Sequence, residues 1–137
     1  MKAIIDTGPW VALIDKNESM HDTCVGWFKN YSGQLFSSEA VLTEVLYLLN
    51  FSIKAQSAAI DFVLKSVVEL IPSDSGSLKK ARSLMQKYSD LPMDYADATI
   101  ICLAMDIGIN NIVTLDYKDF SIYRVKNKPL VIFPEIK

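Results

Sequence analysis

The sequence predicts an α/β protein: a three-layer α/β/α sandwich around a mainly parallel, five-stranded sheet. Five short apolar runs lie along the 137 residues, and most are continuous rather than alternating, as in strands covered on both faces. Helical segments separate these runs, and such alternation favours parallel pairing. Half of the residues are hydrophobic and the net charge is −2. We therefore expect a single globular domain over residues 1–137.

The expected strands and helices follow in order along the chain. Strands are expected at 2–6, 34–37, 67–71, 111–115 and 130–133. Helices are expected at 9–15, 20–31, 39–49, 53–65, 78–88 and 94–107. Pro9 suits a first helical position, and Gly108 stands where the last of these helices should stop. The run PSDSGS at 72–77 is expected to form a turn.

The cysteines, the histidine and the apolar runs exclude several classes of protein. Cys24 and Cys102 form no C-x-x-C pair, so we expect buried thiols in a reducing cytosol rather than a disulfide. His21 is the single histidine, which excludes a zinc site built on several histidines. The N-terminus lacks a signal-peptide pattern, and no apolar run reaches the ~18 residues of a membrane span. We expect a cytoplasmic protein without membrane contact.

The triplet Asp6-Thr7-Gly8 allows two interpretations. One is the Asp-Thr-Gly of an aspartic protease, and the other is an acidic group at the end of a buried parallel strand. The protease needs an all-β chain with this triplet in a loop. Here Pro9 follows at once and a helix is predicted to begin, so the pattern favours the second interpretation.

Acidic residues from distant parts of the sequence are predicted to meet at one edge of the sheet. Asp6 and Asp116 end predicted strands, while Asp94 and Asp97 begin a predicted helix on one face. The carboxyl ends of parallel strands and the following helix starts share an edge, where ligands bind. Plainer roles remain open: Asp94 as an N-cap, Asp97 as the third-position acid of a capping box, Asp116 as a turn residue, and Asp119 as a surface acid.

Glu44 is the acid with the strongest argument from sequence. It lies in AVLTEVLYLL (40–49), where Thr43 is the only other polar residue. A helix that is apolar nearly all round is expected to be buried. A buried glutamate needs a cation or an ion pair, so a salt bridge to a distant base is the alternative to a metal. The apolar pattern of 39–51, which includes Tyr47 and Phe51, favours self-association.

The donor types indicate the metal. Carboxylate oxygens without nearby histidine or cysteine suit Mg²⁺ or Mn²⁺, and carboxylates held close together without a cation repel one another. Thr7 and Thr114 each lie beside a predicted ligand. Either could orient water or hydrogen-bond a carboxylate, or be an ordinary strand or turn hydroxyl.

Three successive segments resemble the motifs of a PIN domain, in particular of VapC-type toxins and their close relatives. They are AIIDTGPWVALID, SSEAVLTEVLYLL and LPMDYADATIICLAMDIGINNIVTLDYKDFSIYR. The resemblance implies a Mg²⁺- or Mn²⁺-dependent endoribonuclease whose catalytic and metal-binding acids are Asp6, Glu44, Asp97 and Asp116. Asp94 and Asp119 would be auxiliary acids. It also implies an RNA substrate, a homodimer and an antitoxin partner.

The sequence does not decide which residues contact RNA, and it leaves other functions as alternatives. Basic residues occur in two groups: Lys79, Lys80, Arg82 and Lys87; and Lys118, Arg124, Lys126 and Lys128. Lys118 and Arg124 are favoured by their place near the acidic edge. A non-cleaving module that binds RNA or protein, or an RNA-processing nuclease without a toxin role, is the alternative. A phosphotransferase of the haloacid-dehalogenase class would need D-x-D, and Gly8 stands two residues after Asp6.

Overall fold

A parallel sheet runs through the computed structural model, which describes residues 1–135. Its strands are β1 (Lys2–Ile5), β2 (Gln34–Ser37), β3 (Val68–Leu70), β4 (Asn111–Val113) and β7 (Val131–Phe133). They lie in the order β3-β2-β1-β4-β7, and all four neighbouring pairs are parallel. The predicted fold class, a five-stranded α/β protein, is confirmed.

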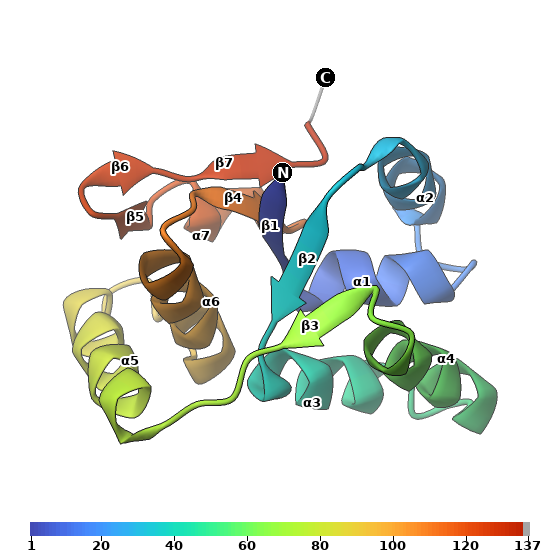
Figure 1. Ribbon diagram of the computed structural model, residues 1–137, viewed down its shortest axis with the longest axis horizontal. Helices are drawn as coiled ribbons and strands as arrows, with labels where there is room; N and C mark the ends of the chain where they lie inside the picture. The colour runs from blue at the N-terminus through green and yellow to red at the C-terminus, as the bar shows by residue number, and fades with distance from the viewer. Residues whose placement is uncertain (136–137) are drawn as a thin grey trace.

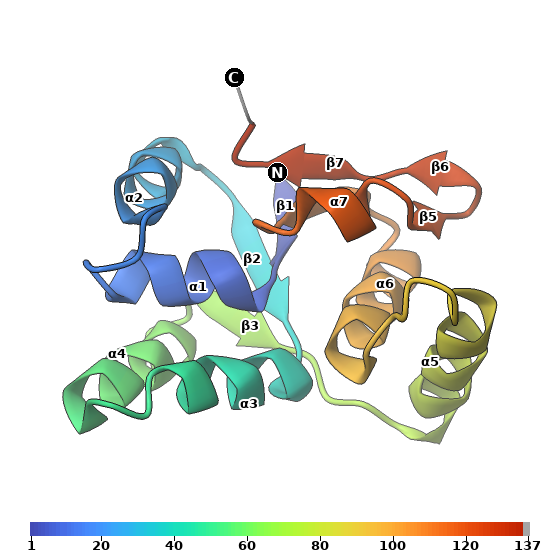
Figure 2. The same ribbon diagram turned by 180° about the vertical axis from the view of Figure 1, so that it is seen from behind.

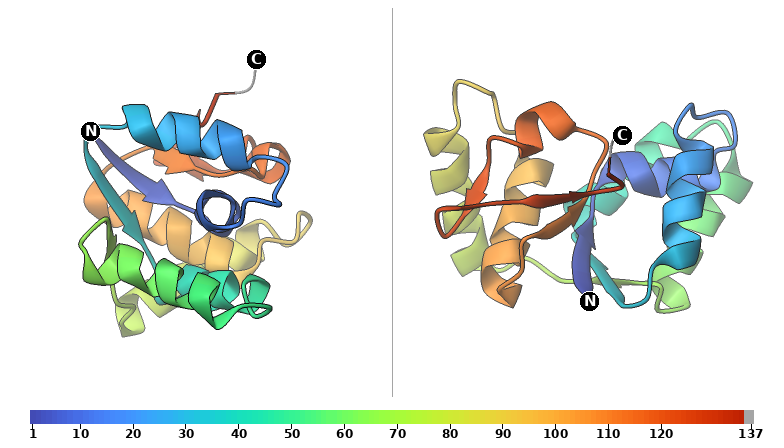
Figure 3. Two further views of the ribbon diagram at one scale, coloured as in Figure 1. Left: turned by 90° about the vertical axis from the view of Figure 1, so that its right-hand side faces the viewer. Right: turned by 90° about the horizontal axis from the view of Figure 1, so that it is seen from above.

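Helices cover both faces of this sheet. They are α1 (Thr7–Ile14), α2 (His21–Asn30), α3 (Glu39–Leu48), α4 (Ile53–Leu64), α5 (Ser75–Lys87), α6 (Tyr95–Ile107) and α7 (Tyr117–Phe120). Figure 1 shows α1, α2 and α4 on one side and α5 and α6 on the other, and Figure 3 shows the sheet between them from above. None of the helices within residues 1–135 has both the length and the apolar character that crossing a membrane requires.

The core lies around β1, which directly precedes Asp6, and α6, which carries Asp97. Ala3, Ile4 and Ile5 of β1 are fully buried, as are Ile100 and Ile101 of α6. Burial on this scale fixes an element more firmly than its helix or strand propensity does. Residues at the ends of β1 and α6 are therefore held on rigid supports.

Several regions differ from the elements expected from the sequence. Helix α1 begins at Thr7, so Pro9 is its third residue rather than its first, and β4 ends at Val113 rather than at residue 115. Helix α5 begins at Ser75, because Asp74 caps it and exchanges hydrogen bonds with Ser77; the expected turn at 72–77 is therefore partly helical. The short helix α7 and the hairpin of β5 (Arg124–Val125) and β6 (Lys128–Pro129) were not expected. Two-residue strands leave no apolar run that a sequence pattern could detect.

The expectation that 39–49 is buried all round is wrong. Only one stripe of α3 is buried: Val41, Val45 and Leu49, at spacings of four residues, are fully covered. Tyr47 and Leu48, by contrast, are 70% and 50% exposed. The helix packs on α1, α4 and α6 through one face and leaves apolar side chains on the other.

Candidate functional site

The beginnings of several helices meet at the carboxyl edge of the sheet, and each carries a predicted acid. Asp6 is the N-cap of α1, directly after β1; Asp94 is the N-cap of α6, with Asp97 in its first turn; Asp116 is the N-cap of α7. Asp116 therefore lies in a helix cap three residues beyond β4 rather than at the strand end that was predicted. Figure 2 shows α1, α3 and α6 beginning close together in the middle of the molecule.

Asp6 is the most enclosed of these carboxyls, at 8% exposure. Its Oδ1 accepts from the N–H of Thr7 and its Oδ2 accepts from Thr114 Oγ1, each at 2.7 Å. Thr114 Oγ1 in turn accepts from the N–H of Asp116 at 3.1 Å. Burial is the main cause that raises the pKa of Asp6 to about 6, and the charges of Glu44 and Asp116 add to it. Thr114 thus ties the start of α7 to the carboxylate of Asp6.

Asp97 has a partner that sequence reasoning missed. The buried hydroxyl of Tyr123 donates to Asp97 Oδ2 at 3.1 Å, from 26 residues away. Burial raises the pKa of Tyr123, so the phenol stays a donor. Burial also raises the pKa of Asp97 to about 8, with the charges of Asp94 and Asp6 adding. Tyr123 lies in the predicted motif, but no local pattern links it to Asp97.

Three of the acids at this edge also lie at the start of a helix: Asp94 at α6, and Asp116 and Asp119 at α7. Asp94 Oδ1 accepts from the N–H of Asp97 at 2.8 Å, so its alternative role as an N-cap is real. Asp116 Oδ1 accepts from the N–H of Asp119 at 3.1 Å. Burial raises the pKa of Asp116, the Asp119 N–H opposes the rise, and the charges of Asp119 and Asp94 add to it. In Asp94 and Asp116 the cap uses Oδ1, so Oδ2 stays available for a cation.

Glu44 is near the acids but is not buried, which corrects the argument from sequence. Its side chain lies on the exposed side of α3, and its Oε1 accepts from Thr7 Oγ1 at 3.3 Å. Partial burial raises its pKa, and the charge of Asp94 adds to the rise. Within residues 1–135 it has no salt bridge, so the alternative of an ion pair to a distant base finds no support there.

No Lys or Arg of the described residues forms a salt bridge with the carboxylates at this edge. Burial and mutual repulsion raise the pKa of all four predicted ligands: Asp6, Glu44, Asp97 and Asp116. Both salt bridges of the described chain lie elsewhere, at Lys65–Asp61 and Lys80–Asp106. Such a cluster of hard oxygen donors fits a divalent cation chemically. As the side chains stand in residues 1–135, however, no three His, Cys, Asp or Glu are arranged to hold one, so a cation would have to draw them together.

The two basic residues expected to contact RNA differ in availability. Lys118 is exposed in α7. Arg124 Nη1 donates to the carbonyls of Ser121, Ile122 and Tyr123 at 2.8–3.0 Å. The guanidinium of Arg124 therefore already closes the turn after α7.

The comparisons with known proteins give the family of the chain and similar folds. The PIN domain family model matches residues 3–127. Among solved structures, VapC20 of Mycobacterium tuberculosis, a toxin that cleaves the sarcin-ricin loop, is 23% identical with a TM-score of 0.78, covering 85% of this chain and 91% of its own. VapBC2 of Rickettsia felis, bound to promoter DNA, is 21% identical with a TM-score of 0.64, covering 97% and 99%. DNA-bound VapBC of Salmonella typhimurium is 20% identical with a TM-score of 0.66, covering 96% and 98%. At these identities the likeness shows a shared fold. No curated protein sequence matches the chain.

Proposed function

This chain belongs to the PIN domain family, and from that premise we propose that it is a Mg²⁺- or Mn²⁺-dependent endoribonuclease that hydrolyses RNA phosphodiester bonds. One observation carries the proposal: the carboxylates of Asp6, Glu44, Asp97 and Asp116 repel one another without any salt bridge to a described Lys or Arg. Uncompensated acids at a ligand-binding edge are costly unless a cation joins them.

Asp6, Glu44, Asp97 and Asp116 would hold the metal, with Asp94 and Asp119 as auxiliary acids. Bound there, a divalent ion supplies a polarised phosphoryl oxygen and a water of lowered pKa. The chain's own part is positioning. Thr114 fixes the carboxylate of Asp6, Tyr123 fixes that of Asp97, and Thr7 hydrogen-bonds Glu44. Ligands held by such partners lose less freedom when a cation arrives.

The proposed setting is a toxin–antitoxin pair in the cytoplasm, with residues 1–137 acting as one nuclease domain. The last two of these residues lie outside the described part of the chain. Similar solved folds include VapBC complexes, which supports an antitoxin protein as partner. Exposed apolar side chains on α3 and α4 support a homodimer.

Cleavage of single-stranded RNA by purified protein tests the proposal. We expect cleavage with Mg²⁺ or Mn²⁺ and none in excess EDTA. Asp116→Asn should lower the rate by about hundredfold or more, as expected for loss of a group that acts directly, and the neighbouring Asp119→Asn should lower it less. Undiminished cleavage in chelator would contradict the metal, and RNA that binds but stays intact with either metal would favour a non-cleaving module.

A further inference from the structure

A hollow lies between α5 and Tyr95, the first residue of α6. The hollow is bounded by Leu78, Lys79, Arg82, Met85 and Tyr95, and its volume is about 700 Å³. Leu78 is 55% exposed and Tyr95 is 38% exposed. The hollow therefore offers apolar and aromatic surface to a ligand. We call these five residues the α5 groove.

The α5 groove is positively charged, although the chain as a whole is not. Lys79 and Arg82 line it, and its lining contains no Asp or Glu. Neither of these two side chains forms a salt bridge within residues 1–135, whereas the adjacent Lys80 is bound to Asp106 at 2.8 Å. In a chain of net charge −2, this is a local site for anions.

Tyr95 joins the α5 groove to the acidic edge. The same side chain also lines a hollow of about 420 Å³ that contains Glu44 and Asp94. Tyr95 directly follows Asp94 and precedes Asp97 by two residues. A polymer with one phosphate at the acids would therefore pass over Tyr95 on its way to α5.

We propose that the α5 groove binds single-stranded RNA next to the bond that is cut. An unpaired base lies against Tyr95, Leu78 and Met85, and the neighbouring phosphates lie against Lys79 and Arg82. The combination of an aromatic platform with cations fits single strands, whose bases are free to stack. This inference rests on the proposed function, because the RNA in the α5 groove is taken to be the same strand that is cut at the acidic edge. It adds Lys79 and Arg82 to the RNA contacts expected at Lys118 and Arg124.

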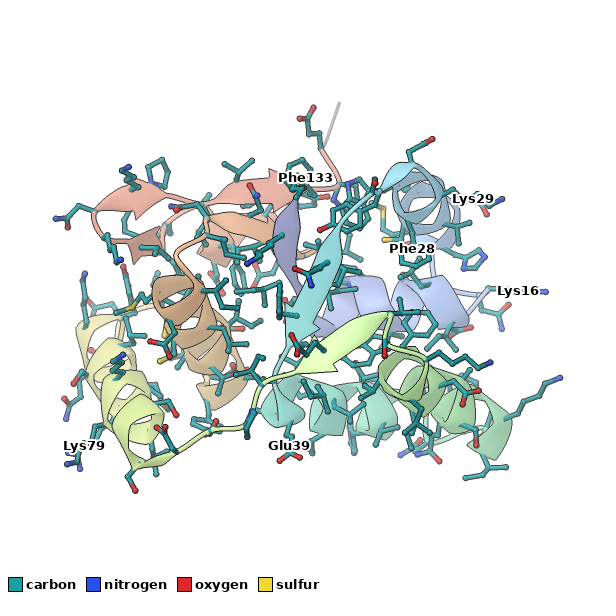
Figure 4. The ribbon with its side chains drawn as sticks, viewed as in Figure 1. Lys16, Phe28, Lys29, Glu39, Lys79 and Phe133 are labelled. Atoms are coloured by element: carbon teal, nitrogen blue, oxygen red, sulfur yellow. The ribbon has the colours of Figure 1, made fainter. Side chains whose placement is uncertain are left out.

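Binding of a fluorescein-labelled single-stranded RNA of about 10 nucleotides, measured in EDTA at several salt concentrations, tests the groove. Lys79→Glu/Arg82→Glu should weaken binding about tenfold or more and reduce the salt slope by about 1 to 2. The charge-matched control is Lys16→Glu/Lys29→Glu, whose side chains lie at the opposite end of the molecule from Lys79 (Figure 4). The control should change binding less than about twofold, since no local contact is lost.

Tyr95→Ala should also weaken binding, and Tyr95→Phe should retain it, because a phenyl ring still stacks. Thermal melts check that each variant folds. Unchanged affinity in the groove variant, or an equal loss in the control, would overturn the proposal and would leave the groove to some other partner. Because binding is read in chelator, it is independent of cleavage. A parent that binds RNA through the groove but does not cut it with Mg²⁺ contradicts the nuclease and keeps the groove.

Discussion

Asp97 is half-buried and is repelled by neighbouring acids, and both effects make the stability of the fold depend on pH. In the unfolded chain an aspartate loses its proton near pH 4, whereas in the folded chain the pKa of Asp97 is about 8. Between these values the folded state binds more protons than the unfolded state. The free energy of unfolding therefore falls as the pH rises toward 8 and is highest below the unfolded pKa.

Asp97→Asn should therefore stabilise the metal-free protein near pH 8. The gain should be about 1 kcal/mol, below the full worth of the pKa shift because solvent screens a partly exposed group. Thermal melts in EDTA across pH measure it, and the gain should shrink toward pH 4. Asp90→Asn, at an exposed position, is the control. A less stable Asp97→Asn in EDTA would show that the carboxylate is a structural partner.

Tyr123 is the positioning residue that the structure adds to the predicted site. Its ring is held edge-on by Tyr88 and Phe120 at centroid distances of 5.0 and 5.1 Å, so its hydroxyl has a fixed place. Tyr123→Phe should keep the packing and lose the bond to Asp97. We expect Mn²⁺ affinity to fall about 10- to 100-fold, as for other outer partners of metal ligands. Tyr88→Phe is the matched control. Equal Mn²⁺ affinity in parent and Tyr123→Phe would remove Tyr123 from the site.

At the scale of elements, α3 is tied to α6 through one buried hydroxyl pair. Ser38 caps α3 by accepting from the N–H of Val41, and its Oγ lies 2.8 Å from Thr99 Oγ1 of α6. This contact sets the helix with Glu44 beside the helix with Asp97. Ser38→Ala should lower the free energy of unfolding by about 1–2 kcal/mol, through the lost cap and the lost hydrogen bond to Thr99, which keeps its bond to the carbonyl of Ala96.

Urea unfolding measures that loss, and Ser52→Ala at the N-cap of α4 is the control. Ser52 also caps its helix, by accepting from the N–H of Ala55, but it does not reach α6. Both variants should lose stability, and Ser38→Ala should also lose cleavage activity. Equal activity in the two variants would mean that α3 needs no tie to α6.

Helices and strands that leave a long apolar pattern in the sequence could be predicted, whereas contacts between segments far apart in the sequence could not. Continuous apolar runs located all five strands of the sheet, and parallel topology placed Asp6 and Asp97 at one edge. The apolar composition of α3 did not reveal that Glu44 is exposed, because a sequence cannot say which apolar face a neighbour covers. The Asp97–Tyr123 bond was hidden for a similar reason: it depends on how the segment after α7 packs on α6.

At the scale of the whole molecule, the exposed apolar surface predicts self-association. Phe51, between α3 and α4, is 65% exposed, and Ile53 and Leu64 of α4 are 78% and 74% exposed. Surface of this kind commonly marks an interface. Sedimentation velocity at micromolar concentration should show a dimer. Phe51→Ser/Leu64→Ser should shift it to monomer, and Ile122→Ser, a single exposed apolar residue on another face, should not. A monomeric parent would remove the homodimer.

The central claim is that the carboxylates at the edge of the sheet form a divalent-cation site. Isothermal titration of Mn²⁺ into metal-free protein at neutral pH tests it without RNA. The account predicts saturable binding by the parent, the same binding by Asp90→Asn, and its loss in Asp97→Asn. An absence of saturable binding in the parent, or binding by Asp97→Asn as tight as the parent's, would contradict it.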